Sequence, residues 1–302
     1  MASGSKKVII AALIGNSLIA VTKFFAAAIT GSAAMMSEGI HSLVDTGNQI
    51  LLLYGLKRAA KPPDARFPFG HGKEIYFWSF VVAILIFAVG AGISMYEGMQ
   101  HILHPPEHMH DPMVNYIVLG LAIIFEGGAL YYALTEFNKV RGAMGYVEAV
   151  QKGKDPSLFV VLFEDCAAML GLLVALFGVA MAQMTHDPFW DGMASVAIGF
   201  ILAFTAIWLA YETKGLLIGE GANPKIVQEI KGLAEKYGCV KEINEVLTLH
   251  MGPEFLLVTI SAHFDDNLPA GKMETVIASI TKEIKANHPF VKKVFIEAES
   301  AE

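Results

Sequence analysis

Charged residues are scarce in this chain, and their scarcity argues against several classes of protein. Of the 302 residues, only 17% are Asp, Glu, Lys or Arg, while 54% are hydrophobic. A soluble domain of this length needs more charge to cover its surface, so we expect the excess apolar residues to face lipid. The net charge of −7 also argues against a nucleic-acid partner, which would require a basic face.

Cysteine is nearly absent as well. Cys166 and Cys239 lie in different segments and share no metal-ligand spacing, so neither a disulfide nor a cysteine-based zinc site is predicted. The chain also lacks the His-Glu-x-x-His and Gly-x-Ser-x-Gly motifs of hydrolases, which argues against an intramembrane metallohydrolase. The sequence contains no low-complexity segment and no convincing internal repeat.

Six apolar stretches are long enough to cross a membrane. A helix that spans a ~30 Å hydrocarbon core needs about 20 residues, because an α-helix rises about 1.5 Å per residue. The sequence therefore predicts a six-helix membrane domain over residues 1–215, whose first helix is a retained span and not a signal peptide. The predicted spans are Val8–Thr30, Ala33–Leu56, Ile75–Met99, Met113–Phe137, Leu158–Met184 and Phe189–Tyr211.

Basic residues are missing from every second connector between these spans. The loops around Gly31, from His101 to Pro112 and from Thr185 to Asp191 contain no Lys or Arg, whereas the opposite connectors carry many. By the positive-inside rule, both termini are predicted to lie in the cytoplasm. The cell inner (plasma) membrane is the expected location. The imidazole-rich loop that includes His101, His104, His108 and His110 is either an outer collecting site for metal or a solvated loop.

Residues 216–302 have the periodicity of a soluble domain. Asn223 and Pro224 are typical of a helix N-cap followed by proline in the first turn, and the helix is expected to continue to about Lys236. Strands are predicted at Ile243–His250, Glu254–His263 and Val291–Glu297, and a second helix at Gly271–Asn287. The order α-β-β-α-β predicts a small α/β sandwich on the cytoplasmic side.

Ionisable residues inside the second and fifth spans are the candidate functional residues, because charged groups are expensive in hydrocarbon. His41 and Asp45 are four residues apart and share a helix face, and Glu38 lies on nearly the same stripe. Their depth along the span places them near the midplane, where Asp165 of the fifth span also falls. An imidazole nitrogen and two or three carboxylate oxygens suit a tetrahedral Zn²⁺ ion. A proton relay or a hydrogen-bond clamp between helices would be the alternative role.

Four motifs together resemble the cation diffusion facilitator family over essentially the whole chain. The resemblance implies six membrane helices, a metallochaperone-like cytoplasmic domain, a homodimer, and exchange of a divalent metal for protons by alternating access. It also implies a transport site built from His41, Asp45 and Asp165, and a histidine at the first of these positions resembles the zinc-preferring branch. The motifs are Gly31–Asp45, Phe67–Glu74, Asp187–Gly192 and Glu212–Glu220.

The expected activity is therefore export of Zn²⁺ from the cytoplasm against H⁺, with the metal as cargo and no prosthetic group. Secondary transport, and not enzymatic catalysis, is the predicted class. Mn²⁺, Fe²⁺, Co²⁺ and Cd²⁺ remain alternative cargoes, since the affinity order of nitrogen and oxygen sites does not decide among them. A membrane metal sensor that signals without transport is the alternative from another class.

The fifth span departs from the zinc-transporting relatives at one position. Val161 stands where those relatives carry a His, four residues before the Asp that Asp165 matches. Glu164 and Glu38 are the competing candidates for the fourth ligand, and the Glu-Asp pair resembles the mitochondrial-type zinc subgroup and its bacterial relatives. Lys23 and Glu126 are also intramembrane, and they would either pair with each other or line a water path.

Further candidates lie outside the spans. His71 in the inner loop is expected either to bind a second ion, as family members often do, or to sit in a tight glycine turn. Lys73 is expected to form a salt bridge at the junction of membrane and cytosol, like its family counterpart. His250 and His263 of the cytoplasmic domain are candidate metal ligands, although the resemblance favours dimerisation as the role of that domain.

Overall fold

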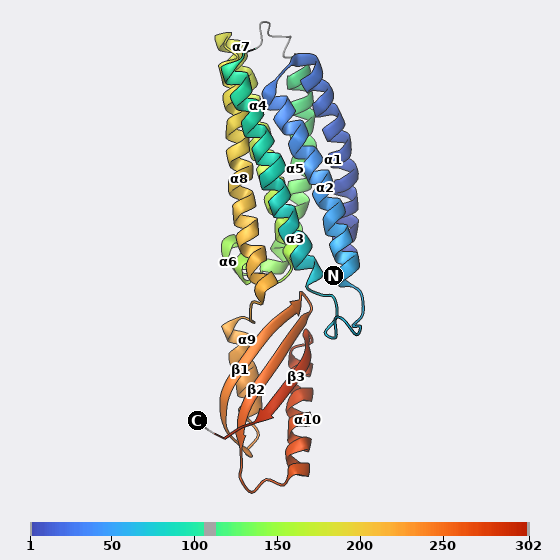
Figure 1. Cartoon of the computed structure of the whole chain (residues 1–302), viewed down its shortest axis with the longest axis vertical. Coiled ribbons are helices and arrows are strands. Elements are labelled where there is room, and N and C mark those ends of the chain that lie inside the picture. Colours follow the sequence, from blue (N-terminus) through green and yellow to red (C-terminus); the bar gives the residue numbers. More distant parts are fainter. Residues whose placement is uncertain (1, 106–112, 301–302) are drawn as a thin grey trace. The chain divides into compact units, whose positions relative to one another are not determined.

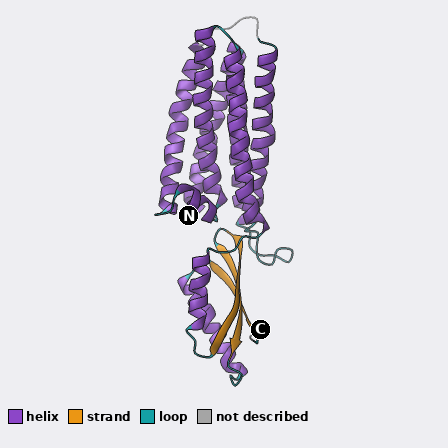
Figure 2. Ribbon diagram, turned by 90° about the vertical axis from the view of Figure 1, so that its left-hand side faces the viewer, coloured by secondary structure: helices purple, strands orange, loops and turns teal. Residues whose placement is uncertain are grey.

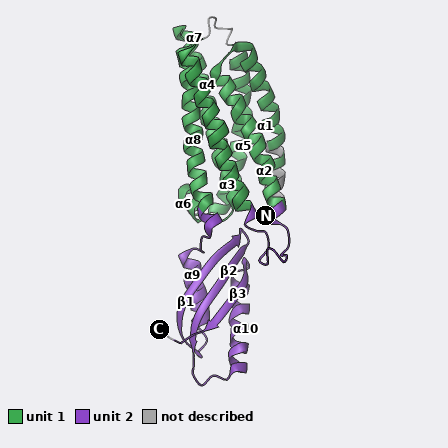
Figure 3. Cartoon of the chain, viewed as in Figure 1, with its two compact units in different colours: residues 1–57, 75–214 green, residues 58–74, 215–302 purple. Residues whose placement is uncertain are grey.

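The chain forms two compact units (Figure 3). The computed structural model describes residues 2–105 and 113–300. The first unit comprises Met1–Lys57 and Ile75–Lys214, and the second comprises Arg58–Glu74 and Gly215–Glu302. The second unit thus contains the connector 58–74 in addition to the C-terminal segment.

The first unit is a bundle of long helices that run side by side (Figure 1). All six predicted spans are found, and the third is built from α3, a π-helical turn η1 and α4. Among the described residues, five helical segments are long and apolar enough to cross a membrane; α2 is the exception, and it carries the polar stripe with His41. The elements are α1 (Ala2–Thr30), α2 (Ala33–Ala59), α3 (Glu74–Leu85), η1 (Ile86–Ala91), α4 (Gly92–Leu103), α5 (Met113–Arg141), α6 (Tyr146–Lys152), α7 (Pro156–Thr185) and α8 (Phe189–Ile218).

Asp191, near the start of α8, holds the first turn of α2. Its carboxylate accepts a hydrogen bond of 2.7 Å from the Ser32 hydroxyl and another of 2.7 Å from the backbone N–H of Ala33. The first N–H groups of a helix have no partner within the helix, so a buried carboxylate satisfies them and also interacts well with the helix dipole. The His101 ring lies 3.2 Å from the same carboxylate. Contacts from α4 and α8 therefore fix where α2 begins.

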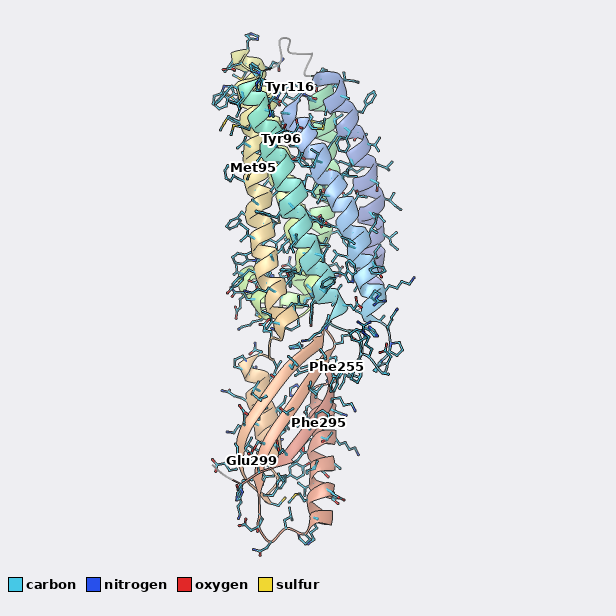
Figure 4. All side chains as sticks on the ribbon, in the orientation of Figure 1. Met95, Tyr96, Tyr116, Phe255, Phe295 and Glu299 are labelled. Carbon is cyan, nitrogen blue, oxygen red and sulfur yellow. The ribbon has the colours of Figure 1, made fainter. Side chains whose placement is uncertain are left out.

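Small residues let α4 and α8 approach closely. An ideal Cβ at Gly98 would lie 2.7 Å from the carbonyl oxygen of Gly192, so no larger side chain fits there without movement. On α4, Met95 faces α8, whereas the neighbouring Tyr96 is 61% exposed and projects outward (Figure 4). The Ser195 hydroxyl of α8 donates a 2.8 Å hydrogen bond to the Ser94 carbonyl of α4.

The second unit is a three-stranded sheet with two helices on one face (Figure 2). Strand β2 pairs antiparallel with β1 and parallel with β3. The predicted order α-β-β-α-β is confirmed, and the Asn223 side chain caps the first helix by accepting from the Lys225 N–H at 3.0 Å. Alternate β2 residues such as Val258 and Ile260 are buried against the helices, while Phe295 is half exposed (Figure 4). The elements are α9 (Pro224–Glu235), β1 (Val240–Gly252), β2 (Phe255–Phe264), α10 (Ala270–Asn287) and β3 (Val291–Ala298).

Candidate functional site

A stripe of buried polar side chains runs along α2. Glu38, His41, Asp45, Asn48 and Gln49 are each no more than 1% exposed, although the helix lies among apolar neighbours. Their spacing of three or four residues keeps them on one side of the helix. Buried polar groups are normally hydrogen-bonded, so the partners of this stripe define what the site can do.

The structure places Asp45 of α2 beside His41 of the same helix and beside Glu164 of α7. The His41 Nδ1 atom lies 3.4 Å from Asp45 Oδ1 without the geometry of a hydrogen bond. The carboxyl groups of Asp45 and Glu164 lie within hydrogen-bond reach of each other. Asn48 orients Glu164 by donating a 2.7 Å hydrogen bond from Nδ2 to Oε1. At the interface between the two helices, α2 thus contributes an imidazole nitrogen and a carboxylate, and α7 contributes a second carboxylate.

Several atoms of this group are buried without a hydrogen-bond partner among the described residues. They are both ring nitrogens of His41, Oδ1 of Asp45 and Oε2 of Glu164. An unsatisfied buried polar atom costs about 1–3 kcal/mol, so such a concentration needs an explanation. These atoms are also the ligand types that divalent transition metals prefer. A cation held between α2 and α7 would supply a partner to one ring nitrogen of His41 and to the two carboxylate oxygens.

Asp165 is also buried, but its side chain leaves α7 in a different direction from that of Glu164. Neighbouring residues on an ideal helix differ by about 100° in direction, and the electrostatic partners of Asp165 are Glu126 of α5 and Glu164. In the described part of the chain, no three His, Cys, Asp or Glu side chains are already arranged as a complete metal site. His41, Asp45 and Glu164 therefore form a partial set, and Asp165 lies on the adjoining face of α7.

Glu38 has a different partner, the ammonium group of Lys23 on α1. Glu38 Oε2 lies 2.9 Å from Lys23 Nζ, and neither side chain is exposed. Lys23 also donates a 2.9 Å hydrogen bond to the Ser42 hydroxyl. The pairing of Lys23 with Glu126 that the sequence suggested is not what the structure contains, although Lys23 is within electrostatic range of Glu126.

Two polar residues of this region, Asn48 and Ser42, were not among the residues predicted from the sequence. Asn48 is seven residues after His41, so the same helical spacing that selected Asp45 could have selected it. Ser42 is four residues after Glu38 and shares its face of the helix, so this spacing could have selected it too, although its role depends on Lys23 of another helix.

The inner-loop residue His71 is buried and held by two acids of its own unit. Its Nε2 lies 2.9 Å from Asp64 Oδ2, and its Nδ1 lies 3.8 Å from Glu74 Oε1. The hydrogen bond with His71, together with the backbone N–H of Phe67, holds the pKa of Asp64 below its ordinary value. The second ion expected at His71 stays a prediction.

The ion pair at this loop is formed by Arg58 and Glu74, whose side chains lie 2.7 Å apart. Lys73 has no carboxylate within ion-pair distance among the described residues, so the salt bridge expected of it is not formed in this structure. Its ammonium lies instead beside Gly219, where an ideal Cβ would be 3.8 Å away.

The structure does not bring His250 and His263 together. His250 pairs with Leu256 at one end of the β1–β2 ladder, and His263 pairs with Glu242 near the other. Seven residues along an extended strand correspond to about 24 Å, so the two imidazoles cannot share an ion within one chain. On the outer loop, His108 and His110 lie outside the described residues.

The membrane unit is similar to a known family along most of its length. A family model described as the cation efflux transmembrane domain matches residues 9–218. The chain is 35% identical over 264 residues to the proton-coupled zinc antiporter SLC30A9, mitochondrial, of Xenopus laevis, covering 87% of this chain and 47% of that protein. The human protein of the same name is 34% identical over 251 residues, covering 82% of this chain and 44% of its own length.

A more distant relative is similar over its full length. The manganese efflux system protein MneP of Bacillus subtilis is 24% identical over 301 residues, covering 97% of this chain and 95% of that protein. By contrast, the chain spans about half the length of the zinc antiporters that it matches.

Proposed function

The chain belongs to the cation efflux family, and from this premise we propose that it is a secondary transporter that exports Zn²⁺ from the cytoplasm in exchange for protons. The observation that carries the proposal is the buried set of His41, Asp45 and Glu164, in which both ring nitrogens and one oxygen of each carboxylate lack a hydrogen-bond partner among the described residues. The names of the zinc antiporters at 34–35% identity support zinc as the cargo and protons as the counter-ion.

We assign the transport site to His41, Asp45, Asp165 and Glu164. A tetrahedral zinc ion needs four ligands, and Val161 leaves no histidine at the position four residues before Asp165. Glu164 is a better candidate for the fourth ligand than Glu38, because it meets Asp45 directly whereas Glu38 is paired with Lys23. Because Asp165 and Glu164 leave α7 about 100° apart, one ion is within reach of both only if it lies between their two faces of the helix.

Exchange follows from competition between metal and protons for the same lone pairs. The imidazole and the carboxyl groups must lose protons to bind the cation, so metal and proton occupancy are linked with opposite sign. The more alkaline face favours loading, and the more acidic face favours release. Movement of α7 against α2 around a fixed midplane site would alternate access between the two faces.

The test is metal flux in proteoliposomes that contain the purified protein, with the vesicle lumen more acidic than the outside. We expect the wild type to take up Zn²⁺ and to alkalinise the lumen at the same time. His41→Ala and Asp45→Ala should reduce both signals to the level of empty vesicles while leaving the size-exclusion profile unchanged.

Thr205→Ala on α8 is the control, because its hydroxyl bonds only within its own helix, to the Ile201 carbonyl. Wild-type flux in either site variant would overturn the assignment of the site, and absence of divalent-metal flux in the wild type would overturn the function.

Manganese is the second candidate cargo, favoured by the full-length similarity to a manganese efflux protein. Direct competition between Zn²⁺ and Mn²⁺ in the same vesicles distinguishes the two.

We further propose a homodimer with both termini in the cytoplasm, in the cell inner membrane. The mitochondrial names of the zinc relatives make a mitochondrial membrane the alternative location.

A further inference from the structure

Lys23 on α1 brings a fixed positive charge to the polar stripe of α2. Its side chain is 0% exposed, and it is the only Lys or Arg found buried among the side chains that the structure describes. Removing an ammonium group from water costs several kcal/mol unless a partner compensates. Here the partner is Glu38, at 2.9 Å from Nζ, and Ser42 accepts a second bond at 2.9 Å.

Glu38 lies at the same interface as the transport site. It precedes His41 by three residues on the buried side of α2. Its second oxygen, Oε1, has no hydrogen-bond partner in the described part of the chain and points at Gly171 of α7, where an ideal Cβ would lie only 2.4 Å away. Gly171 is seven residues beyond Glu164, which is about two helical turns along the same face. Glu38 and Glu164 therefore both lie between α2 and α7, at positions about 10 Å apart along α7.

Glu38 and Glu164 differ in that only Glu38 forms an ion pair with Lys23. Its charge neutralises Glu38, while it lies within electrostatic range of His41 and Asp45 as well. A carboxylate that is already paired with a buried ammonium is a poor ligand for a second cation, because binding the metal would leave that ammonium without its counter-charge. Glu164, which contacts Asn48 and Asp45 and has no ion pair with Lys, Arg or His among the described residues, is not subject to this penalty.

We propose that Lys23 withholds Glu38 from the transported ion, so that it limits the number of carboxylate oxygens at the site and favours zinc over manganese. The proposal rests on the proposed function. Zn²⁺ is satisfied by four nitrogen and oxygen ligands, whereas Mn²⁺ prefers a larger shell rich in oxygen. Freeing Glu38 would add up to two oxygens one turn from His41 and so relax the selection for four-coordinate ions.

The experiment compares Zn²⁺ and Mn²⁺ transport by the reconstituted full chain and its variants. In Lys23→Met, we expect the ratio of kcat/KM for Mn²⁺ to that for Zn²⁺ to rise at least about tenfold, equivalent to about 1.4 kcal/mol. Lys23→Met/Glu38→Gln should restore the wild-type ratio, because it removes the freed carboxylate. Lys23→Arg should retain the wild-type ratio, because it keeps the charge.

A second readout does not depend on transport. Co²⁺ bound to the detergent-solubilised protein should absorb visible light more weakly in Lys23→Met than in the wild type, since additional oxygen ligands take the ion away from tetrahedral geometry. The double variant should recover the intense spectrum. If Lys23→Met does not survive purification, Lys23→Gln removes the charge while keeping a donor for Glu38 and Ser42.

The outcomes separate the two proposals. Wild type that moves no divalent cation overturns the proposed function. Wild type that transports, together with an unchanged manganese-to-zinc ratio and an unchanged Co²⁺ spectrum in the charge-removing variants, overturns the role of Lys23. An equal loss of both metals in Lys23→Met, without recovery in the double variant, means that Lys23 is only structural and also overturns it.

Discussion

At the scale of single residues, the chemistry of the site depends on which polar atoms already have partners. Glu38 and Glu164 are the same residue type, and both are at most 2% exposed. Glu38 faces an ammonium group, whereas Glu164 faces the Asp45 carboxyl and the Asn48 amide. A buried carboxyl next to another carboxyl needs either a proton or a cation between them. This difference makes Glu164 the residue whose charge the cargo would neutralise.

Removing that charge tests the role of Glu164. Glu164→Gln keeps the size of the side chain but replaces one carboxylate oxygen with an amide donor that cannot ligate a metal. We expect the KM for Zn²⁺ to rise at least about 100-fold, because even residues that only support a metal ligand change affinity about 10–100-fold. Zinc uptake as a function of concentration in proteoliposomes is the measurement.

Glu148→Gln serves as the control for this variant, since Glu148 is exposed and paired with Lys152 on the short helix α6. If Glu164→Gln takes up zinc with the KM of the control, Glu164 is not a ligand.

The sequence could predict contacts within one helix but not those between helices. His41 and Asp45 meet because four residues bring side chains to the same face, which is a local property. Whether Glu164 or Asp165 faces Asp45 depends on the rotation of α7 about its axis, which is set by packing along the whole bundle. The same limit applies to Lys23. Residue spacing alone could not show that its partner is Glu38 of α2 and not Glu126 of α5.

At the scale of elements, α2 is held by contacts at several heights. Asp191 caps its first turn, and the Ser37 hydroxyl shares a hydrogen bond with the Ser195 hydroxyl of α8. Further along, Gly171 of α7 leaves room for the Glu38 carboxylate. In a bundle surrounded by lipid, such small residues and polar contacts supply much of the specificity of helix packing.

The close approach at Gly171 gives a prediction for the α2–α7 interface. Gly171→Ala places a methyl group about where Glu38 Oε1 now lies, so it should either separate the helices or displace the Lys23–Glu38 pair. We expect destabilisation of about 1–3 kcal/mol, as for other overpacked interiors, and reduced zinc flux. Thermal unfolding in detergent measures the first effect.

Gly128→Ala on α5 is the matched control, because an ideal Cβ there meets no atom within 4 Å. Equal unfolding temperatures for the two alanine variants would contradict the account of the interface.

The long helices other than α2 were predictable because their length and apolar content alone meet the requirements of a membrane span. The π-helical turn Ile86–Ala91 within the third span was not, since it depends on how that span packs, with Gly90 against Leu202 of α8. Helix α6 was also missed, because its seven residues are too few for a periodic pattern. In the second unit, strand positions followed from alternation, while the parallel pairing of β3 with β2 required the structure.

At the scale of the whole molecule, the candidate metal-binding residues are distributed unequally between the two units. The membrane unit contains the buried group of His41, Asp45 and Glu164 with unpartnered atoms. In the second unit, His250 and His263 lie at opposite ends of a strand pair. We therefore expect the transported ion to be held in the membrane unit, and the sheet unit to contribute assembly.

Zinc-edge anomalous diffraction from crystals of the zinc-loaded protein tests this expectation most directly, because it locates the metal without any assumption about transport. We expect a peak between α2 and α7, within bonding distance of His41, Asp45, Asp165 and Glu164, and no ligand from Glu38. A zinc peak coordinated by Glu38 in the presence of Lys23, or zinc found only in the C-terminal unit, would contradict it.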